Sequence, residues 1–419
     1  MTETLGDKRG DGIEPQVGGP GWCTMRLAIW TFVALGVCSA SASAEPLVFW
    51  GARLSLSGFA SGTLAPEDEG YFNYTGYETN VLRRLRASLS ADLALSGSVS
   101  VLTEVRTDNL AVPKPYALYL RVRPWAKRSF DVQAGLIPPV FGAFARRQYP
   151  ADNPLPGMPL AYQYLTSLRS DAIPENVEGL VAMRGRGWKP LYPVGNTSAD
   201  AGVPLVAAEE WDIGVEARVG RRPLSLAMAV TRGSLSDPGR RTEALAPQVS
   251  GRLVWSPVPA FALGLSGSRG TFLAREVTSV LPSEAKGDWR QEALGADVEI
   301  SRRHVIVRAE AVYTRHHLPP LQATRLEDPL ESLGAYGEVR WKLLPGLYIA
   351  GRADRLSFLD VSTAAGRVPW EAAVTRVEAG VGYTVRPGVL LKAAWQHDER
   401  DGGRVRKADF AVGQVVLWF

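Results

Sequence analysis

Alternation between apolar and polar residues is the feature that most restricts the fold of this 419-residue chain. Sixteen segments show it with a period of two residues. In the segment 374–385, Val377, Val381 and Tyr383 share one face, whereas Glu378 lies on the other. Successive side chains of a β-strand point to opposite faces, so each segment is predicted to be a strand with one apolar and one polar face. The pattern alone fits a soluble sheet as well as a sheet that contacts lipid.

The links between these segments alternate strictly in length. Short links, such as Ser96-Gly97 and Arg302-Arg303, follow every second segment, whereas long links follow the others and reach about 70 residues between Pro139 and Ala208. Short turns at one end and long loops at the other are typical of transmembrane β-barrels with an even number of strands. A soluble β-sandwich gives no reason for this asymmetry. The predicted strands are 47–58, 80–94, 98–108, 115–123, 129–138, 209–219, 223–232, 247–256, 260–270, 290–301, 304–314, 333–343, 346–357, 374–385, 388–397 and 405–419.

Aromatic residues gather near both ends of the predicted strands. Those near long links include Trp211 and Trp395. Those near short links are Trp125, Phe130, Trp255, Phe261, Trp341, Tyr383 and Phe419. Membrane interfaces select such belts of aromatic side chains. Because every backbone N–H and C=O in hydrocarbon must be paired, the sheet has to close on itself. We therefore expect an all-β, antiparallel up-and-down transmembrane barrel in which 405–419 pairs with 47–58.

The beginning of the chain has the features of an export signal. An apolar run at 27–37 follows Arg26 and precedes Ala42-Ser43-Ala44, a small-residue cleavage pattern. The run is too short for a membrane-spanning helix, which needs about 20 apolar residues. We expect residues 1–44 to be an N-terminal extension and signal peptide that are removed, and residues 45–419 to form the barrel.

The composition of the expected mature chain is consistent with a barrel. Translation starts at Met1 or Met25, and both cysteines, Cys23 and Cys38, precede the cleavage point, so we expect no disulfide. Beyond residue 44 the chain has 44 Lys and Arg and 39 Asp and Glu, a formal charge of +5. This mild excess does not indicate a nucleic-acid partner. Mean hydropathy is near zero, as expected where lipid-facing and lumen-facing residues cancel.

The strand pattern, the terminal Phe419 and a long third loop that carries Pro174-Glu175-Asn176-Val177-Glu178-Gly179 resemble Gram-negative trimeric porins, including the phosphate-selective branch. The loop lacks the Phe-Gly-Gly ending of the general-porin motif. The resemblance implies a passive channel in the outer membrane of a Gram-negative bacterium, usually a homotrimer, with the loop at 139–208 folded inward as a constriction. Outer-membrane lipid and small polar solutes are its expected partners, and no cofactor is expected.

Charged residues on the expected lumen face predict how such a channel selects solutes. A barrel of about 16 strands encloses a water-filled lumen, and charges at its narrowest level set ion selectivity. We expect a basic ladder at mid-height on the first three strands, faced by acidic residues of the long loop. The ladder is Arg53, Arg84, Arg86 and Arg106, and the loop residues are Asp152, Asp171, Glu175 and Glu178. Alternatively, these arginines only line a wet wall and pair with Glu104. Other lumen charges alternate in sign, so we expect a weak anion preference.

No residue pattern typical of an enzyme stands out. His316 and His317 are adjacent, so on a strand their rings point to opposite faces, which does not suit a metal site. We expect no catalytic residue and no metal ligand. Two functional classes remain: a diffusion channel, and a barrel that acts through its outer loops as an adhesin, receptor or hydrolase. The strand count could also be 14 or 18.

Overall fold

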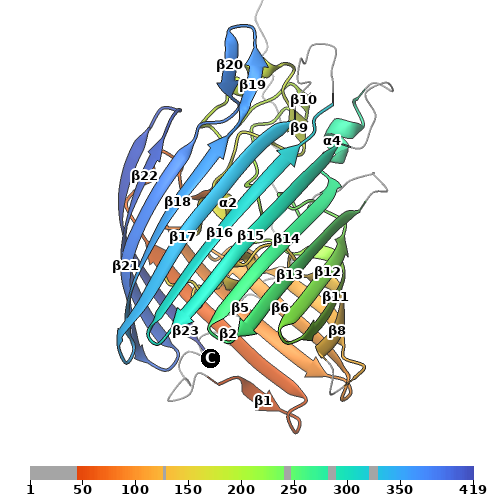
Figure 1. Ribbon diagram of the computed structural model, residues 1–419, viewed down its shortest axis with the longest axis vertical. Helices are drawn as coiled ribbons and strands as arrows, with labels where there is room; N and C mark the ends of the chain where they lie inside the picture. Colours follow the sequence, from red (N-terminus) through yellow and green to blue (C-terminus); the bar gives the residue numbers. More distant parts are fainter. Residues whose placement is uncertain (1–44, 126–128, 240–246, 282–288, 320–328) are drawn as a thin grey trace, which may run out of the picture.

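The computed structural model describes residues 45–125, 129–239, 247–281, 289–319 and 329–419. In these residues sixteen antiparallel strands form one closed barrel, each hydrogen-bonded to the next and the last to the first. Figure 1 shows the strands tilted around the barrel, with the C terminus at the end of the short turns. The barrel strands are β2 (Leu54–Leu64), β5 (Arg84–Ala94), β6 (Val99–Asp108), β7 (Lys114–Val122), β8 (Ser129–Ile137), β11 (Asp212–Arg221), β12 (Leu224–Thr231), β13 (Gln248–Val258), β14 (Phe261–Thr271), β15 (Arg290–Arg302), β16 (Val305–His316), β17 (Leu330–Leu344), β18 (Leu347–Phe358), β21 (Val374–Arg386), β22 (Val389–Arg400) and β23 (Lys407–Trp418).

The predicted barrel and its count of sixteen strands are confirmed, but the first predicted strand is wrong. The other fifteen agree with the structure to within four residues at each end. The segment 47–58 contains β1 (Leu47–Phe49), a turn and the start of β2, and β1 folds back on β2. The turn uses positive φ angles at Trp50, Gly51 and Ala52. The alternation of residues continues through this turn, which is why the sequence pattern did not reveal it.

Closure occurs between the predicted neighbours in a shifted register. β23 pairs with β2 from Phe59 opposite Trp418 to Leu64 opposite Gly413. The backbone N–H of Phe419 donates to the carbonyl of Gly58 at 3.0 Å, and the N–H of Gly58 donates back to Phe419 at 3.1 Å. The final strand therefore pairs with 58–64 and not with the whole of 47–58.

The faces of the wall are inverted relative to a soluble protein. On β21 the outward Val377 and Tyr383 are 42% and 47% exposed, whereas Arg376 and Glu378 are fully buried toward the lumen. The same alternation exposes apolar side chains around the barrel. An apolar exterior around a charged interior is the arrangement of a transmembrane barrel.

The smaller elements lie in the long loops. They are the hairpins β3 (Tyr74–Gly76) with β4 (Thr79–Asn80), β9 (Ala172–Ile173) with β10 (Val194–Gly195) and β19 (Asp360–Thr363) with β20 (Gly366–Pro369), and the helical turns η1 (Phe144–Arg147), α2 (Leu160–Gln163), α3 (Val177–Val181) and α4 (Arg275–Thr278). In the described part of the chain, no helix has the length and apolar character needed to cross a membrane. Figure 1 shows β19 and β20 rising above the end of the barrel opposite β1.

The connection between β8 and β11 is the longest in the protein and lies against the inner face of the wall. Phe144 and Tyr162 from this connection are buried with Tyr336 and Leu356 from the wall strands. We call residues 138–211 the inner segment. Its position explains why inward side chains of β16 to β22 are buried although the barrel is wide.

Candidate functional site: the charged lumen

Carboxylates of the wall hold the inner segment by its backbone. Glu310 on β16 accepts hydrogen bonds from the N–H of Ala143 at 2.8 Å and of Phe144 at 3.3 Å, and also from the hydroxyls of Tyr162 and Tyr336. Its side chain is almost fully buried. A buried carboxylate needs several donors to offset the loss of water, and the chain entering η1 supplies two of them.

Two further wall strands repeat this contact. Glu378 on β21 accepts from the N–H of Gly157 at 3.0 Å, and Asp354 on β18 accepts from the N–H of Leu160 at 3.2 Å. A Cβ atom at Gly157 would lie 2.7 Å from the carboxylate of Glu378, so any other residue would require this side chain to move. The inner segment is thus fastened to β16, β18 and β21, on one side of the lumen.

The charges of this side largely neutralise one another. Arg352 lies between Glu338 on one neighbouring strand, at 3.3 Å, and Glu378 on the other, at 2.6 Å. Arg376 pairs with Asp398 at 2.7 Å. All five side chains are nearly inaccessible to solvent. These pairs run across strands as a ladder, so they hold the wall together and leave little net charge for a passing ion.

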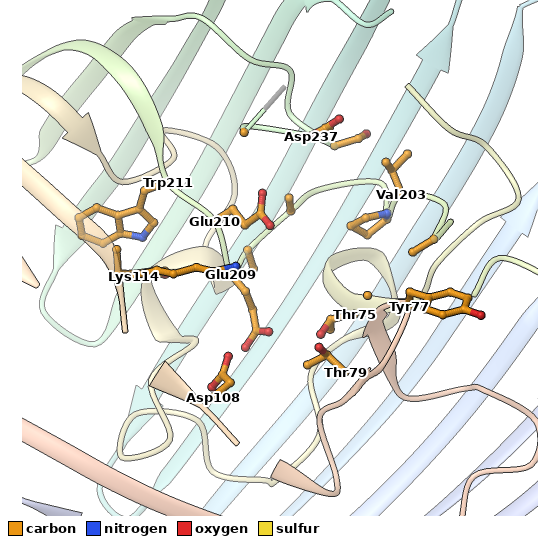
Figure 2. Close-up of a pocket in the computed structure, with 18 of the residues that line it drawn as sticks. Thr75, Tyr77, Thr79, Asp108, Lys114, Val203, Glu209, Glu210, Trp211 and Asp237 are labelled. Carbon is orange, nitrogen blue, oxygen red and sulfur yellow. The ribbon is translucent and has the colours of Figure 1, made fainter. Parts of the chain in front are cut away.

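Two cavities lie where the inner segment leaves room. The outer cavity, of about 1070 Å³, lies between the first long loop, the inner segment and the outer ends of β6 and β7. Figure 2 shows Glu209, Glu210 and Trp211 on one side of it and Tyr77 on the other. Among the described lining residues, the acidic ones are Glu78, Asp108, Asp171, Asp200, Glu209, Glu210, Asp237 and Glu276, and the basic ones are Arg86, Arg106 and Lys114. Acidic groups therefore dominate this cavity.

The inner cavity, of about 590 Å³, lies at the end of the short turns and has the opposite charge. Its described charged lining residues are Arg123, Arg146, Arg218, Arg252 and Asp131. Arg218 pairs with Glu216, and Arg252 with Asp297. Arg146, from η1 of the inner segment, forms no ion pair with a described residue. Burial and the nearby positive charges of Arg218 and Arg252 lower the pKa of Arg146 to about 10, so it stays charged at neutral pH.

The predicted basic ladder is only partly assembled. Arg84 and Arg86 both bind the carboxylate of Glu209, at 2.7 and 2.6 Å, and Arg86 also binds Asp108 at 2.6 Å. Burial raises the pKa of Glu209, but the charges and hydrogen bonds of the two arginines outweigh burial and hold this pKa well below its usual range. Arg53 is exposed in the turn before β2, at the short-turn end, and the prediction of a mid-wall position for it was wrong.

Arg106 belongs to a separate cluster. Its guanidinium binds Glu104 at 3.0 Å and lies over the ring of Tyr116, 3.3 Å from the ring centre. The other oxygen of Glu104 accepts from the hydroxyl of Tyr149 at 2.8 Å, which links the wall to the inner segment. Arg106 therefore lies beside Glu104 on the same strand, the arrangement considered as the alternative.

None of the acidic residues predicted on the loop is an ion-pair partner of the arginines of β5 and β6 in the described residues. Asp171 lines the outer cavity but binds Arg169 at 2.8 Å. Glu175 is exposed, and Glu178 accepts from the N–H of Ala364 in the β19–β20 turn. Burial raises the pKa of Asp152 against the nearby positive charges of Lys392, Arg147 and Arg308. The counter-charges of Arg84, Arg86 and Arg106 are instead Glu209, Asp108 and Glu104.

The sequence-based prediction missed Glu209, Asp108 and Arg146. Asp108 was visible as the last residue of a strand next to Arg86 on the neighbouring strand, so pairing of predicted strands would have found it. Glu209 and Arg146 lie on the inner segment, and their positions depend on its path, for which the sequence has no periodic signal.

The histidines of β16 and β22 lie on different faces of the wall. His316 is buried, whereas the side chain of His317 is 40% exposed and lies 3.8 Å from Glu292, so the two rings point to opposite faces. His397 pairs with Asp409 on the outward face at 2.9 Å. Within the residues that the structure describes, no group of three or more His, Cys, Asp or Glu side chains has the arrangement of a metal site.

Comparison with known proteins identifies the fold. No family model matches the sequence, and no curated protein matches it. The structure is similar to the outer membrane channel DcaP of Acinetobacter baumannii, with a TM-score of 0.53 and 11% identity over 90% of this chain and 100% of that chain. OmpF of Salmonella typhi, solved with Daunomycin, gives 0.52 and 12% over 89% and 100%. An anion-selective porin from Comamonas acidovorans gives 0.52 and 6% over 87% and 99%. The porin-type barrel predicted from the sequence is therefore confirmed as the fold.

Proposed function

We propose that this chain, which has the fold of the porins, is a channel for passive diffusion of small polar solutes and ions across the outer membrane of a Gram-negative bacterium. The observation that supports this most is the inverted wall, with exposed apolar residues outside and charged residues around cavities inside. Hydrocarbon would cover the exterior, and water would fill the cavities. The inner segment, which includes the predicted constriction at 139–208, would narrow the lumen without an added plug.

We propose a weak anion preference for this channel. Four arginines and one aspartate are the described charged lining residues of the inner cavity, and Arg146 forms no ion pair with a described residue. An uncompensated positive charge on a narrow path attracts anions and repels cations. The preference is weak because the ladder on the opposite side of the lumen is self-neutralised and the outer cavity is acidic.

We further propose that the functional unit is a homotrimer. The wall is uneven, since β7 and β8 have 9 residues, whereas β17 has 15. A tilted transmembrane strand needs about 9–11 residues, so the short wall barely spans a bilayer. Contact with neighbouring subunits would cover the polar rim of this wall. The mass of the protein in mild detergent tests this: three chains are expected, and a stable monomer would contradict it.

The export of the protein is part of the same proposal. Residues 1–44 lie outside the described residues and are proposed to be the N-terminal extension and signal peptide. The protein begins at Glu45 after their removal and then contains no cysteine. Mass spectrometry of the protein isolated from outer membranes checks the cleavage point, and an intact residue 1–44 segment in that protein would contradict it.

Single-channel recording tests the channel itself. Residues 45–419, refolded in detergent and inserted into a planar bilayer, are expected to give discrete ion steps. Under a salt gradient, the reversal potential is expected to be displaced slightly from zero toward the equilibrium potential of the anion. Folded protein that inserts but gives no steps would contradict the channel proposal. A clear cation-side potential would contradict only the anion preference.

A further inference from the structure

We infer that the two cavities separate charge along the channel axis, so that the outer cavity concentrates cations, the inner cavity concentrates anions and the channel rectifies current. The inference rests on the proposed channel function. It concerns how charge is distributed along the channel, whereas the proposed function concerns the passage of solutes and a weak overall anion preference.

The acidic surplus of the outer cavity is not cancelled by ion pairs. Glu78, Glu210 and Glu276 line this cavity and form no ion pair with a described residue. Burial and the nearby charges of Asp237 and Glu209 raise the pKa of Glu210, as expected where carboxylates crowd without enough counter-ions. Such a cluster gains stability from a cation that enters it.

Two polar groups on side chains that line the outer cavity have no hydrogen-bond partner among the described residues. Tyr116 is 8% exposed and its hydroxyl has no hydrogen-bond partner among the described residues, and the same holds for the indole N–H of the partly buried Trp211. Both side chains line the cavity, with their rings 5.0 Å apart. A buried donor without a protein partner is costly unless a solvent or solute atom satisfies it. Glu78, Glu210 and Glu276 are exposed, so mobile ions can reach the acidic lining.

The inner cavity has the opposite surplus. Arg123 and Arg146 line it and form no ion pair with a described residue, whereas Asp131 is the one described acidic lining residue and accepts from Gln133 at 3.0 Å. The short turns place this cavity at the barrel end opposite the outer cavity. The arrangement is a negative region toward one end of the barrel and a positive region at the other.

This arrangement determines the polarity at which the current is larger. A positive potential on the outer side drives cations from the outer cavity and anions from the inner cavity toward each other, so carriers accumulate between them. The opposite potential draws both away and depletes the middle of the channel. Mobile salt screens fixed charges within about 10 Å at 0.1 M and about 3 Å at 1 M, so the asymmetry should fade at high salt.

Single-channel currents at equal voltages of opposite sign test the inference. At about 0.1 M KCl we expect roughly twofold more current when the outer side is positive, and a ratio close to one at about 1 M. An Ala365→Cys variant in the exposed β19–β20 turn, labelled with biotin, shows the orientation of each channel. Streptavidin added to one chamber should perturb the current only when this turn faces that chamber.

Charge variants assign the effect to the two cavities. Arg146→Glu and the double variant Glu210→Gln with Glu276→Gln should each bring the ratio at low salt toward one. Arg355→Glu is the matched control for Arg146→Glu, because it makes the same charge change on an exposed, outward-facing side chain. The ratio of currents at the two polarities in Arg355→Glu should match that of the unmodified channel.

The outcomes separate the inference from the proposed function. Ion steps with equal currents at both polarities, or a larger current when the outer side is negative, would overturn the inference and leave the channel proposal intact. An unchanged ratio in Arg146→Glu would also overturn it. The absence of any ion steps from folded protein would overturn the channel proposal and the inference with it.

Discussion

Single buried carboxylates fix the position of the inner segment, and Glu310 is the clearest example. Four donors from two different parts of the chain converge on this side chain. Removing the carboxylate leaves buried donors unpaired, which costs about 1–3 kcal/mol for each uncompensated group. The residue therefore couples the stability of the barrel to the shape of its lumen.

Glu310→Ala should lower the free energy of unfolding by about 3 kcal/mol and make single-channel current noisier, because the start of the inner segment loses its anchor. Urea titration followed by tryptophan fluorescence, together with bilayer recording, measures both effects. Glu299→Gln is the control, since it removes one partly exposed ion pair to Arg308 and should cost less than about 1 kcal/mol. Equal effects of the two variants would show that Glu310 is not an anchor.

Two adjacent carboxylates of the outer cavity should respond differently to acid. The pKa of Glu210 is raised and that of Glu209 is held well below its usual range, so Glu210 takes up a proton first as the pH falls. The outer cavity therefore becomes less negative as the pH falls, and the reversal potential should move toward anions. This shift should be smaller in Glu210→Gln. A shift of full size in that variant would mean that other groups titrate.

At this scale the sequence predicted which side chains face the lumen but not which of them meet. The alternation of faces along each predicted strand correctly placed Arg84, Arg86 and Arg106 on the lumen side, because alternation is a local property. The partner Glu209 comes from 123 residues beyond Arg86, at the end of an irregular segment. Such a contact depends on the route of the chain through the barrel, which no local pattern encodes.

The closing strands depend on one small residue. A Cβ atom at Gly58 of β2 would lie 2.8 Å from the carbonyl oxygen of Ser88 and 2.9 Å from the ring of Phe419. At Gly62 of the same strand a Cβ atom would meet nothing within 4 Å. The two glycines lie on the same strand and the same face, but only at Gly58 would a Cβ atom meet neighbouring atoms.

Gly58→Ala should therefore destabilise the closed barrel by about 1–3 kcal/mol, because either the backbone of β5 or the ring of Phe419 must shift. Gly62→Ala should be neutral or slightly stabilising. The temperature at which the band of folded protein disappears on a detergent gel, compared between the two variants, measures the difference. Equal resistance would contradict the role of Phe419 in closure.

Strand positions were predictable because each one carries its own two-residue period and a turn at each end. The exception is instructive, since β1 and β2 are joined by a turn whose residues continue the alternation through Trp50 and Ala52. Their positive φ angles are uncommon for residues other than glycine, so sequence rules placed no turn there. The error moved Arg53 from the rim to the middle of the wall.

At the scale of the whole molecule, one sheet separates two environments, an apolar exterior and the lumen. The outward side chains of β12, Leu224, Leu226, Met228 and Val230, are all exposed, whereas the intervening Ala227 and Ala229 are buried on the lumen side. In a bilayer the first set should contact acyl chains and the second should face the lumen. Soluble proteins rarely leave so many apolar residues uncovered.

A cysteine scan along β12 in lipid vesicles tests this separation most directly. Each residue from Leu224 to Thr231 is replaced in turn, labelled with a nitroxide, and probed with oxygen, which collects in acyl chains, and with a water-soluble nickel complex. Oxygen should be favoured at positions 224, 226, 228 and 230 and disfavoured at the positions between them. Equal access of the nickel complex to both sets, or no period of two residues, would contradict a lipid-facing wall around an aqueous lumen.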